Sequence, residues 1–229
     1  MNRKPFAHNE WYHCYTRGVD KRKTFQNERD YQRFLQLLYL ANNDKAIHRS
    51  DLKLTHKEIF AQVRGKQLVS IAAFCLMPNH FHIVMSEAVD GGISRFMQKV
   101  GIAYTMYFNI KNKRVGNLFV KPFRSKHIAN DEYLKQVVQY IHLNPLEVFE
   151  PEWKHGHVAT SRALEMRLRR YSYSSLAAYE SDEQSERAIL DPDAVLLAKD
   201  EWRSLSDILQ DTRAYYAELS PTKNVKMLS

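Results

Sequence analysis

The sequence has few cysteines and no long apolar segment. Its 229 residues include only Cys14 and Cys75, and these do not form a CxxC pair. Two thiols argue against a disulfide framework and a zinc finger, and suit a reducing compartment. No apolar run is long enough to cross a bilayer, and residues 1–5 (MNRKP) carry no apolar signal core. We therefore expect a cytoplasmic protein with no membrane partner.

Positive charge is in excess. The formal net charge is +8 and the pI is about 9.4, which favours an anionic partner, nucleic acid being the commonest. Six of the cations lie within residues 111–126, close to the aromatic residues of 104–123. Phosphate neutralisation combined with base stacking is the usual way of binding single strands. On its own, the same stretch also fits a solvated helix end followed by aromatic residues of the core.

Apolar patterns predict the order βαββαβα. Strands are expected over residues 10–17, 68–76, 80–85 and 122–128, and the continuous apolar run 68–76 is typical of a central strand. Helices are expected after the cap residue Asn27, over 93–111, and from Asn130 or Asp131 up to a stop before Pro145. This order predicts an α+β fold, a ferredoxin-like antiparallel sheet with helices packed on one face.

Two histidines stand two residues apart in the third predicted strand. Side chains alternate along a strand, so His80 and His82 emerge on one face, close enough to share a metal ion. Such a pair often arises by chance. It is also incomplete, because a cation acting on phosphate needs further donors and open positions.

The segment 139–145 (QYIHLNP) offers both a nucleophile and a third donor. Tyr140 and Asn144 are four residues apart and share one helix face. A phenol has a pKa of about 10, and a nearby cation favours its deprotonation and polarises a phosphate. Tyr140 is equally explained as a packing residue and Asn144 as a helix end. His142 faces elsewhere on the helix and ranks below Asn144 as a ligand.

Four blocks of the sequence, in order, resemble one family. They are 77–84 (MPNHFHIV), 116–125 (GNLFVKPFRS), 140–145 (YIHLNP) and 171–179 (YSYSSLAAY). These blocks are similar to the MPNHxHLL, GHLWQGRFKS, YIHLNPV and YxWSSYxAY segments of the HUH (His-hydrophobic-His) single-tyrosine transposases of the insertion sequence 200 type. The REP-associated tyrosine transposases are the most similar branch.

The resemblance implies an HUH-endonuclease fold and an enzyme that cleaves and rejoins single-stranded DNA. It makes His80 and His82 the metal pair, with Mg²⁺ or Mn²⁺ as the expected cofactor. Tyr140 becomes the nucleophile that forms a 5′-phosphotyrosine and frees a 3′-hydroxyl. Asn144 occupies the position where related enzymes place a third ligand, although it is a neutral and weak donor.

The resemblance also implies a partner, single-stranded or hairpin DNA, bound by a monomer or a homodimer. Lys121, Arg124 and Lys126 become candidate phosphate contacts. Two departures from the family pattern affect this DNA-facing loop. Asn117 replaces a histidine, and Lys121-Pro122 replaces a Gln-Gly type of turn.

Residues 1–150 are expected to form the catalytic domain and residues 151–229 a partly helical C-terminal extension. A polar, serine-rich joint is predicted over 172–181 and two short helices within 191–219. We expect an accessory role for residues 180–229. Three alternative functions stay open at this point: a replication initiator or relaxase, a domesticated hairpin-DNA-binding protein without catalysis, and a metal oxygenase.

Overall fold

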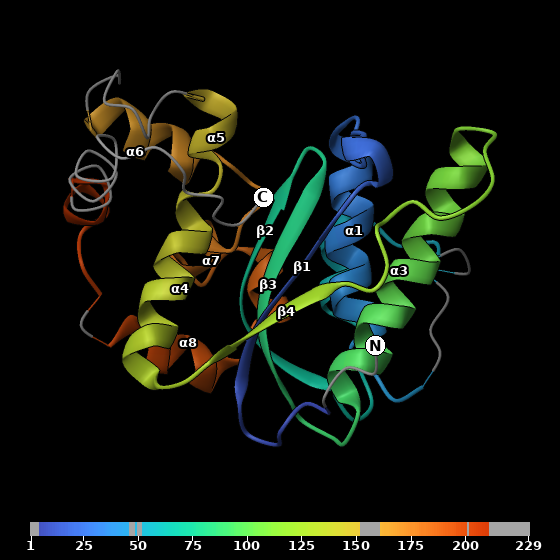
Figure 1. The fold of residues 1–229 in the computed structure, drawn as a ribbon, viewed down its shortest axis with the longest axis horizontal. Coiled ribbons are helices and arrows are strands. Elements are labelled where there is room, and N and C mark those ends of the chain that lie inside the picture. Colours follow the sequence, from blue (N-terminus) through green and yellow to red (C-terminus); the bar gives the residue numbers. More distant parts are fainter. Residues whose placement is uncertain (1–4, 46–48, 50–51, 152–160, 201, 211–229) are drawn as a thin grey trace.

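The structure is built around a four-stranded antiparallel sheet (Figure 1). It is a computed structural model that describes residues 5–45, 49, 52–151, 161–200 and 202–210. The strands lie in the order β2-β3-β1-β4, and their bounds are β1 Trp11–Arg17, β2 Val69–Met77, β3 His80–Glu87 and β4 Arg124–Ile128. The expected α+β class is confirmed, and every strand end lies within two residues of its predicted position.

Helices connect and cover these strands. Their bounds are α1 Glu28–Ala41, α2 His56–Phe60, α3 Gly92–Lys111, α4 Asp131–Leu143, α5 Leu146–Phe149, α6 Ser161–Arg169, α7 Leu176–Glu180 and α8 Pro192–Lys199, with 3-10 turns η1 Val19–Lys21 and η4 Ser185–Ile189. The side chains of Asn27 and Asn130 accept the backbone N–H groups of Asp30 and Tyr133, so both predicted N-caps are confirmed. Among the described helices, none combines the length and the apolar character of a bilayer span.

Helices cover both faces of the sheet. In Figure 1, α1 and α3 lie on one face, and α4, α7 and α8 lie on the other. On the first face, the ring centroids of Phe34 in α1 and Phe81 in β3 are 4.8 Å apart. Because side chains alternate, His80 and His82 point to the second face. The expected single covered face is therefore wrong: most of β2 and β3 is buried, and each apolar face needs its own layer.

Strand β2 lies at one edge of the sheet and not at the centre, where its apolar run placed it. Its outer side pairs with the segment 172–181, predicted as a polar joint. The N–H of Leu76 donates to the carbonyl of Tyr173, and the N–H of Ser175 donates to that of Phe74, both over 2.9 Å. An apolar run shows that both faces of a strand are buried and says nothing of its neighbours in the sheet.

The C-terminal elements η4 and α8 share the main core with the sheet. Ile189, Val195 and Ala198 are buried in the same apolar cluster as β2, and the N–H of Asp191 donates to the carbonyl of Ile71 over 2.8 Å. The extension is partly helical, as expected. Its boundary at residue 150 stays a prediction.

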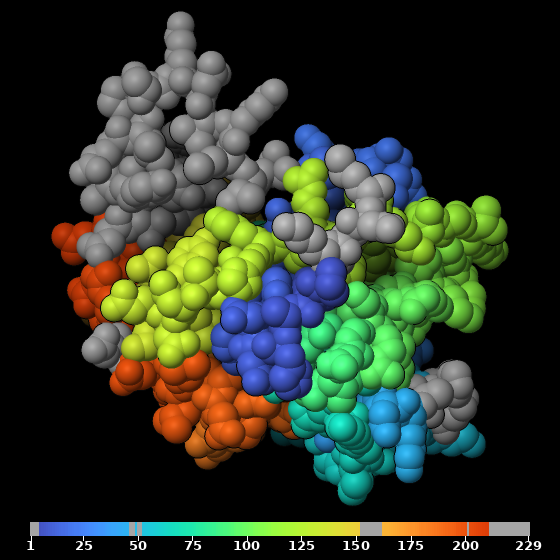
Figure 2. Space-filling model, turned by 60° about the horizontal axis from the view of Figure 1, so that its bottom comes forward, coloured from blue at the N-terminus to red at the C-terminus, as the bar shows by residue number. Residues whose placement is uncertain are grey.

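Two further features complete the described chain. A second buried cluster joins α5, α6 and α7 to the helical residues 205–210. The rest of the second helix predicted within 191–219 lies outside the described residues. At the opposite end of the chain, the N-terminal segment lies on the surface between the segments that contain α3 and α4 (Figure 2). There Phe6 packs edge-on against Tyr12, with ring centroids 4.8 Å apart.

Candidate active site

His80 and His82 lie side by side on the face of the sheet that α4 covers. The register of β1 against β3 places Arg17 opposite His80 and Tyr15 opposite His82. The two imidazole centroids are 5.0 Å apart. The two side chains lie on one face of β3, as their spacing predicted.

Each histidine uses its Nδ1 atom in a hydrogen bond. His80 Nδ1 lies 2.6 Å from the side-chain oxygen of Asn79, and His82 Nδ1 lies 2.8 Å from Nε2 of His13 on β1. Sequence reasoning did not select His13. The sequence shows only that His13 and Tyr15 share one face of the first strand. That this face lies beside His82 follows from the pairing of β1 with β3, which the sequence does not show.

Burial keeps these rings uncharged at neutral pH. It is the main cause that lowers the pKa of His80, and it lowers the pKa of His82 well below the ordinary value, helped by His13 and His80. It also lowers the pKa of His13 from 6.5 to about 4, with a further contribution from Lys126. A neutral imidazole is the form that ligates a metal ion, so the pair is available as ligands over the physiological pH range.

Tyr140 and Asn144 lie at the C-terminal end of α4, the helix on the histidine face of the sheet, and Glu147 lies in the short helix α5 that follows. The helix ends before Pro145, as predicted: α4 stops at Leu143, and a separate helix, α5, begins at Leu146. The expected cause is wrong, because the backbone of Asn144 and Pro145 stays in the right-handed helical region. The pre-proline restriction is a bias, and here the turn is kept by the N–H of Glu147, which donates to the carbonyl of Asn144 over 3.0 Å.

The charge of Glu147 acts on the histidine site. Its carboxylate opposes the burial effect on the pKa of His80 and contributes to the raised pKa of the Cys75 thiol on β2. The start of α5 therefore lies near His80 and Cys75.

The donors present fit a divalent cation in part. Among the described residues, no three His, Cys, Asp or Glu side chains converge into a ready ligand group. The third donor expected from the sequence is the amide of Asn144. Asn144 is 4% exposed, and its amide nitrogen has no hydrogen-bond partner in the described structure. If Asn144 were the third ligand, its side-chain oxygen would bind the cation, because an amide nitrogen is a hydrogen-bond donor with no free lone pair. Water or phosphate oxygens would complete the shell of Mn²⁺ or Mg²⁺.

His142 takes no part in this group. It is fully buried in α4, and its Nε2 lies 2.7 Å from the hydroxyl of Ser175. Burial lowers its pKa to about 3. The residue therefore ties α4 to the segment that covers the edge of β2, in keeping with its low rank as a ligand.

The structure separates the three candidate phosphate contacts. Arg124 stands opposite Tyr15 and Lys126 stands opposite His13, so β4 brings both exposed cations to the histidine face. Lys121 instead lines a groove of about 480 Å³ beside α3, together with Thr16 from the other face of the sheet.

Comparison with known proteins identifies the family of the chain. Residues 7–144 match the family model described as "Transposase IS200 like". The chain belongs to this transposase family. A solved structure, a REP-associated tyrosine transposase bound to a REP hairpin, is similar over 77% of this chain and 82% of its own, with 15% identity and a TM-score of 0.47. No curated protein sequence matches significantly. Family membership gives the protein a transposase-type function on DNA.

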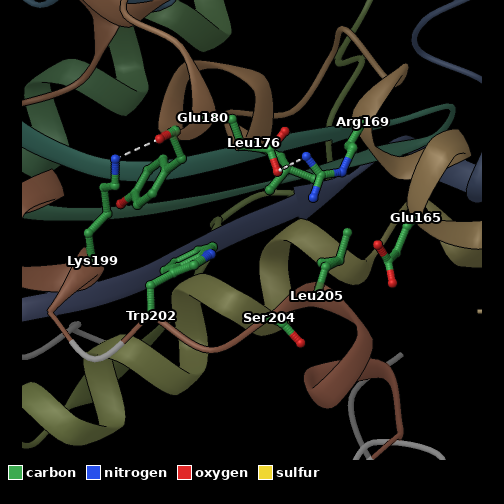
Figure 3. A pocket seen from close by; sticks show the side chains of 9 residues that line it. Glu165, Arg169, Leu176, Glu180, Lys199, Trp202, Ser204 and Leu205 are labelled. Carbon is green, nitrogen blue, oxygen red and sulfur yellow. Dashed lines mark hydrogen bonds and ion pairs between the residues drawn. The ribbon is translucent and has the colours of Figure 1, made fainter. Parts of the chain in front are cut away.

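The transposase also has a cavity of about 340 Å³ in its C-terminal part (Figure 3). It lies among α6, α7 and α8, and Trp202 forms part of its wall. Arg169 and Glu180 form an ion pair of 2.8 Å there, and Lys199 donates to the carbonyl of Tyr179 over 2.8 Å. None of the site residues predicted from the sequence lines this cavity.

Proposed function

We propose that this transposase cleaves and rejoins single-stranded DNA through a covalent link to Tyr140. The observation that supports the proposal is the position of α4, the helix that contains Tyr140 and ends at Asn144, on the sheet face to which His80 and His82 point. A candidate nucleophile and a candidate metal-ligand pair thus belong to elements that pack against each other. This is the set of groups that tyrosine-dependent phosphoryl transfer needs.

The chemistry balances with the chain's own residues. The Tyr140 hydroxyl attacks phosphorus, so that a bond from tyrosine oxygen to phosphorus forms while the bond from phosphorus to the 3′ oxygen breaks. The phenolic proton passes to solvent, and the 3′ oxygen takes up a proton as it leaves. When bound by His80, His82 and Asn144, Mg²⁺ or Mn²⁺ supplies Lewis-acid stabilisation of the charge on phosphate. Rejoining is the reverse reaction: a 3′-hydroxyl attacks the phosphorus of the 5′-phosphotyrosine and loses its proton, the bond from tyrosine oxygen to phosphorus breaks, and the phenol takes up a proton.

Arg124 and Lys126 support a polyanionic substrate at this face, because both are exposed on the side of the sheet that carries the histidines. The substrate we propose is single-stranded or hairpin DNA, in which an unpaired phosphodiester can enter between the sheet and α4. An intact duplex is wider and stiffer.

Metal removal and histidine substitution test the proposal. Wild-type protein with a labelled hairpin and Mg²⁺ or Mn²⁺ should cleave the DNA, and chelator should stop cleavage. The double substitution His80→Ala and His82→Ala should also abolish cleavage but leave hairpin affinity nearly unchanged, since the cations on β4 remain. His127→Ala, a histidine half exposed on β4, is the matched control and should cleave normally. Persistent cleavage by the double variant without metal would overturn the metal assignment, and binding without cleavage by the wild type would favour a non-catalytic DNA-binding protein.

A further inference from the structure

His80 and His82 are each held at Nδ1 by a side chain that the proposed chemistry does not use. The partners are Asn79, which precedes β3, and His13 in the middle of β1. We propose that Asn79 and His13 are positioning residues that fix the tautomer of the histidine pair, so that both rings present the Nε2 lone pair to the metal ion. The inference rests on the proposed function, because it assigns a role within the same site.

The hydrogen bond between His80 and Asn79 allows only one assignment of donor and acceptor. An amide oxygen only accepts, so the Nδ1 atom of His80 must carry the proton that is donated over 2.6 Å. The amide nitrogen of Asn79 is engaged separately, at 3.4 Å from the carbonyl of Lys21, which agrees with the oxygen facing His80. A neutral ring protonated at Nδ1 keeps its lone pair on Nε2.

The hydrogen bond between His13 and His82 allows two assignments of donor and acceptor, and only one of them leaves Nε2 of His82 free to bind a metal ion. If His13 donated its Nε2 proton, the single proton of neutral His82 would sit on Nε2 and block that atom as a ligand. If His82 donates from Nδ1, its Nε2 lone pair is free and His13 accepts. The second arrangement is the one that gives His82 the same tautomer as His80.

The sheet holds His13 in the position that this role requires. His13 and His82 are diagonal neighbours across β1 and β3, and their ring centroids are 5.0 Å apart at an interplanar angle of 29°. Both side chains belong to regular strands, so their separation is fixed by backbone pairing. A second-layer partner of this kind sets the ring orientation and raises the basicity of the ligand.

The tautomers are measured directly in the metal-free full chain. Long-range ¹H–¹⁵N NMR correlations of the imidazole nitrogens should show His80 and His82 as Nδ1–H rings and His13 with an unprotonated Nε2. A His82 ring protonated at Nε2 would overturn the inference, even if DNA cleavage proved to be metal-dependent. This measurement needs neither metal nor DNA, so it is independent of the proposed function.

Metal affinity gives the second readout. His13→Phe keeps a ring but removes the acceptor, and Mn²⁺ binding measured by titration calorimetry should weaken by about 10–100-fold. His13→Gln restores an acceptor oxygen and should recover most of the loss, whereas the control His127→Phe should bind Mn²⁺ as the wild type does. Equal affinity of His13→Phe and wild type would contradict the role of His13. Failure of the wild type to bind Mn²⁺ would instead count against the proposed function. If His13→Phe does not fold, the NMR result on the wild type decides.

Discussion

At the scale of single residues, His142 couples stability to pH. Its imidazole is fully buried, and burial lowers its pKa from 6.5 to about 3. Between these values the unfolded chain binds a proton at this residue and the folded chain does not. The free energy of unfolding therefore falls as pH drops below about 6.5, and continues to fall until the pH approaches 3.

The substitution His142→Phe isolates this effect. At pH 7.5 the variant should be the less stable protein, because the bond to Ser175 is lost. Below about pH 6.5 the stability difference should shrink by up to about 1.4 kcal/mol per pH unit, since only the wild type titrates at this position. Urea unfolding of both proteins at pH 7.5, 6 and 5 measures the difference. A gap that stays constant across this range would contradict the account.

The histidine pair was predictable and its partners were not. Alternation along one strand is a local property, so the spacing of His80 and His82 was enough to place them on one face. The contact of His13 with His82 spans 69 residues of sequence. It depends on which strands pair and in which register, and neither follows from the pattern of one segment.

At the scale of secondary-structure elements, the sequence predicted well which segments form helices and strands. It predicted poorly how these elements are arranged in space. The caps at Asn27 and Asn130 and the strand limits depend on local chemistry, which a single sequence carries. The edge position of β2 and the second covered face depend on contacts between distant segments. The pattern of one segment does not contain those contacts.

The accessory role expected for residues 180–229 overlooked the contact of η4 and α8 with the sheet. Ile189 is 2% exposed and belongs to the main core, so Ile189→Ala should lower the free energy of unfolding by about 2–5 kcal/mol. Leu196 in the neighbouring helix is 74% exposed, and Leu196→Ala should change it by no more than about 0.5 kcal/mol. Chemical denaturation of the two variants checks the prediction. Similar small losses would show that η4 is peripheral to the fold.

At the scale of the whole molecule, the net charge of +8 makes DNA binding depend on salt. The logarithm of hairpin affinity should fall linearly with the logarithm of salt concentration. Lys126→Ala removes an exposed cation from the histidine face and should reduce that slope by roughly 0.7–0.9, the value of one phosphate contact. Lys57→Ala, exposed on α2, is the control and should leave the slope unchanged. Equal slopes for wild type and Lys126→Ala would remove this residue from the DNA interface.

The fold brings together a sheet face with a histidine pair, a helix with a candidate nucleophile, and two cations on β4. If Tyr140 attacks phosphorus, one product must remain covalently attached to the protein until a strand displaces it. Tyr140→Phe removes one oxygen and little volume, so the free energy of unfolding should change by no more than about 1–3 kcal/mol and DNA binding should survive.

The most direct measurement is the covalent adduct on a denaturing gel. Hairpin DNA labelled on the 5′-phosphate side of the cleavage point is mixed with Mn²⁺ and each protein. Wild type should carry label at the position of the protein, and so should the control Tyr133→Phe, which alters another tyrosine of α4. Tyr140→Phe should carry none. A labelled adduct with Tyr140→Phe would show that another residue is the nucleophile, and cleavage by wild type without any adduct would show that water attacks instead.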